Sequence, residues 1–243
     1  MRHTFYLAPA LALAAALAIL CAALGYRSGL WGLNPAFAVL RSGAVAAAAG
    51  AALSLLVAIW AACRKRRRLL VVSLCGLLAG ALAFGLPFAM LRMARGLPAI
   101  HDVTTDTVNP PDFIALRAAR LASPNGIEYG GRHVAEDQHK NYPDIASLTY
   151  AGRPEQAYAR CLAIAQGLGW QIAGADPGAL RIEATDRTFF FGFRDDVVIR
   201  ITPVAEGSAS RVDLRSVSRV GGSDFGTNAK RVRAFLRALA SAD

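Results

Sequence analysis

The chain has 243 residues, of which 54% are hydrophobic, and its formal net charge is +10. Soluble domains are usually about 45–50% apolar, so a membrane-embedded portion is expected. Residues 1–96 contain ten Lys and Arg residues and no Asp or Glu, which leaves 17 basic and 17 acidic residues in 97–243. The excess charge therefore lies beside apolar segments rather than on a soluble face, and no nucleic-acid partner is expected.

Three apolar runs predict transmembrane helices at residues 5–25, 42–62 and 69–91. Each run exceeds the roughly 18–20 residues that cross a hydrocarbon core, and a backbone in lipid satisfies its hydrogen bonds as a helix. The first run is longer than the about 7–15 apolar residues of a signal peptide, which favours an uncleaved helix over a cleaved signal. Residues 1–96 are thus predicted to be a membrane domain.

Basic residues in the loops predict the orientation. Loop 63–68 carries five positive charges, whereas loop 26–41 carries only Arg27 and Arg41. Dense Lys and Arg residues mark the cytoplasmic side, so the N-terminus is expected in the cytoplasm and residues 97–243 outside it. Arg92 and Arg95 oppose this orientation with two charges against five.

The membrane domain also contains features that suit partners. Gly76 and Gly80 are spaced for close helix packing, either in self-association or with a protein partner, although small residues are common in such spans. The basic loop suits a topology anchor, and binding of anionic lipid headgroups is the alternative interpretation.

Residues 97–243 predict an α+β soluble domain. Residues 97–150 are an extended, turn-rich lead-in with a short helix at 111–121, and Pro154 begins a helix with an apolar stripe. Apolar and polar residues then alternate near 170–173, 180–185, 197–202 and 211–216, which predicts four or more antiparallel strands with one buried and one wet face. A last helix is expected from Ser223 and Asp224. The result is a two-layer domain in which two helices flank a sheet.

Several segments resemble the bacterial family called domain of unknown function 1499. They are FGFRDDVVIR at 191–200, SRVDLRSVSRVG at 210–221, SDFGTNA at 223–229, IHDVTTDT at 100–107, NPP at 109–111, YPD at 142–144, GW at 169–170 and RIEA at 181–184. The resemblance covers roughly residues 97–240, and similar membrane spans often precede this domain. It implies a bacterial envelope protein of the inner membrane with a periplasmic domain, and it implies no activity.

Two acidic sites are candidates for catalysis. Asp195 and Asp196 are neighbours on a predicted strand, so their side chains point to opposite faces. The favoured interpretation is a turn or strand-start role, or pairing with Arg194 and Arg200. His101 and Asp102 suit an orienting pair, but no Ser or Cys nucleophile accompanies them. No catalytic residue is therefore assigned, and a hydrolase-like envelope enzyme is the alternative function.

Neither a metal nor a cofactor is expected. His133, Glu136, Asp137 and His139 supply metal-ligand types in the lead-in, but their spacing matches no standard site, so loop polarity is the favoured interpretation.

Aromatic residues cluster at 189–193. Three consecutive Phe residues cannot all face one core, so a patch that includes Phe191, Phe193 and the adjacent Arg194 is a candidate surface for lipid or a partner. An ordinary core with an exposed edge is the favoured interpretation.

The junction between the last strand and the last helix is the second candidate site, since helix N-termini bind anions. Simple capping by Ser223 or Asp224, with Arg219 paired to Asp224, is the favoured interpretation, and anion binding is the more specific hypothesis. The residues proposed to bind an anionic ligand there are Arg215, Arg219, Ser223, Asp224 and Asn228. Together the two sites predict a non-catalytic, membrane-tethered module that binds a lipid, a small anion or a protein. A structural subunit of a membrane complex is a further alternative.

Overall fold

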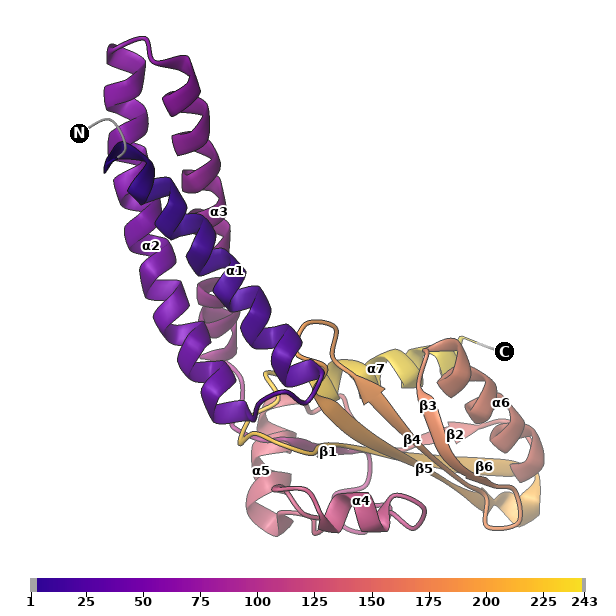
Figure 1. Cartoon of the computed structure of the whole chain (residues 1–243). Coiled ribbons are helices and arrows are strands. Elements are labelled where there is room, and N and C mark those ends of the chain that lie inside the picture. The colour runs from indigo at the N-terminus through magenta and orange to yellow at the C-terminus, as the bar shows by residue number, and fades with distance from the viewer. Residues whose placement is uncertain (1–3, 242–243) are drawn as a thin grey trace. The chain divides into compact units, whose positions relative to one another are not determined.

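Three long helices form the N-terminal unit of the computed structural model, which describes residues 4–241 (Figure 1). A short 3-10 turn, η1 (Thr4–Tyr6), leads into α1 (Leu7–Arg27), α2 (Leu33–Cys63) and α3 (Arg67–Ala94). In the described residues these three helices are long and apolar enough to cross a membrane, by length and composition. The prediction of three such helices is confirmed.

The second helix begins earlier than predicted. It starts at Leu33, because Pro35 suits a first helical turn and the helix continues past Arg41. Much of the predicted loop 26–41 is therefore helical. The predicted start after Arg41 was too late, because a helix can continue past a charged residue at the end of its apolar run.

Small residues bring the three helices together. A Cβ atom added at Gly76 would lie 2.6 Å from the Cβ of Pro9, and one added at Gly80 would lie 2.6 Å from the carbonyl oxygen of Ala47. Both contacts fall inside the three-helix unit. Gly76 and Gly80 therefore allow close packing of the helices within one chain.

A six-stranded antiparallel sheet forms the centre of the second unit, which comprises Leu97–Phe189 and Phe193–Asp243. Its order is β1-β6-β5-β4-β3, and β2 also pairs with β6. The strands are β1 (Asp102–Thr104), β2 (Leu148–Tyr150), β3 (Gln171–Asp176), β4 (Arg181–Arg187), β5 (Arg194–Val204) and β6 (Ala209–Ser218). The four predicted strands are confirmed, and the lead-in adds the two short ones.

Two helices cover one face of this sheet, as predicted. Helices α6 (Pro154–Gly167) and α7 (Thr227–Ala240) bury a core that includes Cys161, Trp170, Ile199 and Phe235. Burial raises the pKa of the Cys161 thiol to about 12, so this thiol stays protonated at neutral pH. The helix α7 begins later than predicted, because Phe225 and Gly226 adopt positive φ angles of 53° and 74°.

The other face of the sheet is covered in its middle by the lead-in, so it is not the wet face that the alternation predicted. Phe113 and Leu116 from the lead-in pack on Val198 and Val217 of the sheet. The lead-in also contains α4 (Arg117–Leu121) and α5 (Gly131–Asn141), so it is not merely an extended segment. Residues in the middle of β5 and β6 are consequently buried on both faces.

A buried carboxylate fastens the lead-in to the sheet. Glu183 of β4 accepts hydrogen bonds from the backbone amides of Ile114, Ala115 and Leu116 at 2.7, 3.0 and 2.8 Å. Three amide donors satisfy a carboxylate that would otherwise be costly to bury.

Candidate functional site

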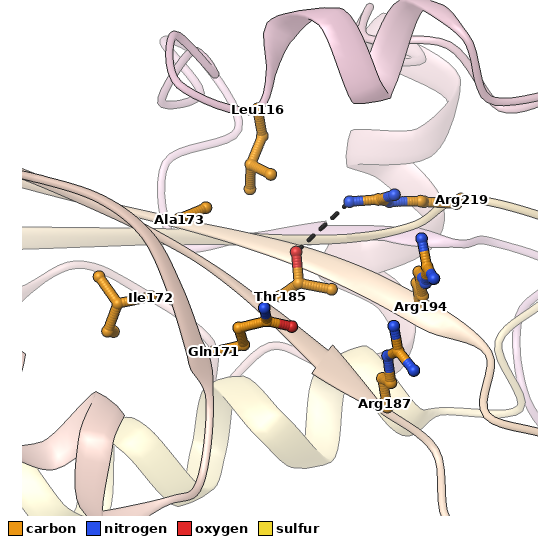
Figure 2. A pocket seen from close by; sticks show the side chains of 8 residues that line it. All are labelled: Leu116, Gln171, Ile172, Ala173, Thr185, Arg187, Arg194 and Arg219. Carbon is orange, nitrogen blue, oxygen red and sulfur yellow. Dashed lines mark hydrogen bonds between the residues drawn. The ribbon is translucent and has the colours of Figure 1, made fainter.

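An arginine-lined hollow of about 240 Å³ lies on the polar face of the sheet (Figure 2). Figure 2 shows three arginine side chains gathered toward one end and Leu116 and Ala173 at the other. We call this the arginine hollow, and its lining consists of Leu116, Gln171, Ile172, Ala173, Thr185, Arg187, Arg194 and Arg219.

Strand register explains why the arginines meet. In the antiparallel pair of β4 and β5, Arg187 lies opposite Arg194, and Thr185 lies opposite Asp196. Side chains two residues apart on a strand share a face, so all four point to the same side of the sheet. Arg219 follows the end of β6, and its amide donates to the carbonyl of Arg194 at 2.9 Å.

One of the three arginines is neutralised. The guanidinium of Arg219 donates to both carboxylate oxygens of Asp196 at 2.9 Å each, in the two-point geometry that makes such pairs strong. Thr185 donates to the same carboxylate at 2.8 Å, and the buried Arg120 approaches it at 3.5 Å. Asp196 is fully buried, and burial lowers the pKa of Arg120 below its ordinary value.

The other two arginines lack a counter-charge. Within residues 4–241, neither guanidinium, of Arg187 or of Arg194, makes a side-chain hydrogen bond or an ion pair to another residue. Both side chains are exposed. Like charges placed directly opposite each other across two strands repel, so this end of the hollow carries an unbalanced positive charge.

The aromatic segment forms the connection between β4 and β5. The amide of Thr188 donates to the carbonyl of Phe193 at 2.9 Å, and the amide of Phe193 donates to Thr188 Oγ1 at 2.9 Å. Phe189 is 95% exposed, whereas Phe191 and Phe193 are partly buried. The aromatic residues therefore lie in a loop that follows Arg187 and precedes Arg194, not in a strand.

The candidate anion site at the last helix is already occupied by the chain itself. Asp224 accepts hydrogen bonds from the amides of Gly226 at 2.8 Å and Asn228 at 2.6 Å. Burial raises the pKa of Asp224, and these two amide donors act against that shift. The amides that an external anion would need are thus bound, and capping is the role that the structure supports. The hydroxyl of Ser223 accepts a hydrogen bond from the amide of Phe225 at 3.3 Å, within the same turn.

The remaining residues of that predicted cluster lie on opposite faces of the sheet. Asn228 binds Ser216 and Arg231 on the helix-covered face. Arg215 lies on the polar face, where it is 1% exposed and donates to Asp102 at 2.8 Å. The predicted pairing of Arg219 with Asp224 is wrong, because Arg219 binds Asp196 instead.

The carboxylates of both candidate catalytic pairs are held in ion pairs with arginines. Asp195 binds Arg231 at 2.8 Å on one face, while Asp196 binds Arg219 on the other. The opposite orientation of the two carboxylates is as predicted, but their expected partners Arg194 and Arg200 are wrong; Arg200 binds Asp106 and Asp213. Asp102 is paired with Arg215. The backbone carbonyl of His101 accepts hydrogen bonds from the amide of Ser218 and from the side chain of Asn228.

The polar cluster of the lead-in lies on α5. His133 approaches Asp137 at 3.8 Å, one turn along the helix, and His139 lies 3.3 Å from Thr107. In the part of the chain that the structure describes, no group of three or more His, Cys, Asp or Glu residues is placed to hold a metal ion.

Sequence reasoning named Arg194 and Arg219 but missed Arg187, Gln171 and Thr185. The alternation of apolar and polar residues places Arg187 on the polar face of its strand, but it does not show which residue of the neighbouring strand lies opposite Arg187. Counting outward from a connection at 188–193 would have paired Arg187 with Arg194, so the hairpin register was the available signal.

Comparison with known proteins gives a family and a distant structural likeness. The family model described as "Protein of unknown function (DUF1499)" matches residues 102–239. The search of the curated proteins found no match. The protein CV1439 from Chromobacterium violaceum, known from a crystal structure, has 17% sequence identity to this chain and a TM-score of 0.30. The match covers 40% of this chain and 94% of the CV1439 chain.

Proposed function

The chain belongs to the DUF1499 family of proteins of unknown function, and we propose that it is a membrane-anchored binding module. In this proposal the soluble domain holds a small anionic group, such as a phosphate or a carboxylate, in the arginine hollow and does not transform it. The observation that carries the proposal is the facing pair of Arg187 and Arg194, which has no counter-charge among the described residues.

The chemistry of the hollow supports an anionic ligand. The planar guanidinium group matches the oxygen atoms of a carboxylate or phosphate, and one anion between Arg187 and Arg194 would remove their mutual repulsion. Leu116 and Ala173 offer apolar surface at the other end, which suits a short hydrocarbon part of the same ligand.

Binding without catalysis fits the state of the carboxylates. A general acid or base must be within reach of a substrate proton, yet Asp102, Asp195 and Asp196 are buried and held by arginines. The hydrolase-like alternative would have to break one of these ion pairs before its chemistry could begin.

The proposed location is the bacterial inner membrane, with the N-terminus in the cytoplasm and the soluble domain in the periplasm. Five consecutive basic residues, Arg64 to Arg68, which form the turn after α2 and the start of α3, support this orientation.

The proposal is tested by the response of the full-length protein to inorganic phosphate and acetate. We expect either anion to raise the melting temperature of the wild-type soluble domain, because a ligand that binds the folded state stabilises it. The variant R187Q/R194Q should lose at least about tenfold in anion affinity, which corresponds to about 1.4 kcal/mol. Without an anion, the same variant should melt at or above the wild-type temperature, since the like-charge pair is gone.

Arg181→Gln is the matched control, because Arg181 also lies on β4 and on the same face but does not line the hollow. An anion response that survives in R187Q/R194Q, or that falls equally in R181Q, contradicts the proposal. If the proposal holds, the physiological ligand can be identified by mass spectrometry, as a small molecule that co-purifies with the wild type and not with R187Q/R194Q.

A further inference from the structure

A second basic hollow lies within the N-terminal unit, far in sequence from the arginine hollow. Its volume is about 280 Å³, and it is lined by Tyr6, Arg66, Arg67, Arg68 and Leu69. We call it the helix-end hollow, because it is formed where η1 leads into α1 and where α3 begins.

A tight turn after α2 places the basic residues at the helix-end hollow. The amides of Lys65 and Arg66 donate to the carbonyls of Ala62 and Ala61 at 3.0 and 2.8 Å, and Lys65 adopts a positive φ of 53°. The chain therefore reverses directly after α2, and Arg66, Arg67 and Arg68 fall on one short segment beside the end of the apolar helices.

Aromatic rings surround the same end of the helices. Trp60 stacks on Phe5 with ring centroids 4.4 Å apart, and the guanidinium carbon of Arg66 lies 5.1 Å from the centroid of the Trp60 ring. Such rings are typical of the boundary between hydrocarbon and headgroups, where one side of the side chain is apolar and the other is wet.

No carboxylate of this unit can balance the charge. Residues 1–96 contain no Asp or Glu, and the side chains of Arg66, Arg67 and Arg68 make no hydrogen bond or ion pair to another described residue. The three arginines that line the hollow are exposed, so they are accessible to an anion from outside the unit. At the end of membrane-crossing helices, the most abundant anion is the phosphate of a phospholipid.

We propose that the helix-end hollow is a binding site for one anionic phospholipid. The arginines hold the headgroup phosphate, the Tyr6 hydroxyl supplies a further hydrogen bond, and the acyl chains lie along the apolar helices. A topology anchor needs only the number of charges in the loop, whereas a binding site needs the particular residues that line the hollow. This difference makes the proposal testable.

The test is native mass spectrometry of the full-length protein in detergent with equimolar phosphatidylglycerol and phosphatidylethanolamine. We expect the wild type to retain phosphatidylglycerol at least tenfold more strongly. The variant R67Q/R68Q should lose this preference, while the control R64Q/K65Q should change it less than threefold. Both variants remove two charges from the same loop, and Arg64 and Lys65 do not line the hollow.

A third variant, R67K/R68K, keeps the charge and removes the planar two-point geometry, and an intermediate affinity is expected. Equal losses in R67Q/R68Q and R64Q/K65Q, or no preference for phosphatidylglycerol in the wild type, would overturn the proposal. Displacement of the lipid by an equal concentration of inorganic phosphate would also overturn it, since the site would then recognise a free anion.

Discussion

Individual residues on the polar face of the sheet act mainly through buried ion pairs. Arg215 donates to Asp102, to the carbonyl of Ile127 at 3.1 Å, and lies over the rings of Phe113 and Tyr129. Burial is the main cause that raises the pKa of Tyr129 to about 12, with the charge of Asp102 acting in the same direction. Arg215 of β6, which the sequence predicted to bind a ligand, thus holds the lead-in against the sheet.

Arg215→Met should lower the free energy of unfolding of the soluble domain by about 3–5 kcal/mol, because Asp102 would remain buried without its partner. Denaturant unfolding, followed by the fluorescence of Trp170 in a background with Trp31 and Trp60 changed to Phe, measures the change. Trp170 is suitable because it is buried and stacks on Phe235 at 5.7 Å. Arg237→Met, at an exposed position of α7, should change stability by less than about 0.5 kcal/mol. A similar effect of both substitutions would show that the Arg215 pair is not a stabilising contact.

Helices and strands differ in how well they could be predicted from the sequence. The membrane helices, the four long strands and the helices α6 and α7 carry periodic apolar patterns over many residues, so their existence was predictable. The strands β1 and β2 have three residues each, which is too short for a periodic signal. Helix α5 has Val134 as its one large apolar residue and therefore shows no stripe. The arginine hollow was only half predictable, because it depends on which residues lie opposite each other in the register.

Helix α3 offers a test of packing within the N-terminal unit. Gly80→Ala should destabilise this unit by about 1–3 kcal/mol, because the added Cβ would lie 2.6 Å from a backbone carbonyl oxygen of α2. Gly85→Ala is the matched control, since no atom lies within 4 Å of its added Cβ, and it should be neutral or slightly stabilising. The loss of helical circular dichroism on heating in detergent measures both. Equal melting temperatures for the two variants would mean that the small residues do not control packing.

At the scale of the whole molecule, charge is divided unequally between the two parts of the chain. Residues 1–96 hold the entire excess of basic residues, and the soluble domain is neutral overall. Each part nevertheless contains a hollow whose arginines lack a counter-charge among the described residues, the arginine hollow in one and the helix-end hollow in the other. Each belongs to its own unit, so the two proposals stand or fall separately.

The orientation of the whole chain is open to a direct test. Alkaline phosphatase fused after Asp243 should be active in a bacterial host, because the enzyme matures only outside the cytoplasm. A fusion after Arg66, within the basic turn, should be expressed but inactive. An expressed and inactive fusion at the C-terminus would refute the proposed orientation.

The pairing of β1 with β6 has a consequence for how the protein is made. Asp102 lies opposite Val217, so the first strand of the soluble domain meets its neighbour only when the last strand has left the ribosome. Until then β1 lacks its ladder partner, and the lead-in lacks Arg215 as the counter-ion of Asp102. Such long-range pairings form late, because the loop between them must first be closed at an entropic cost. Synthesis that stops before β6 would therefore leave an unfinished sheet with exposed strand edges, a suitable target for quality-control proteases.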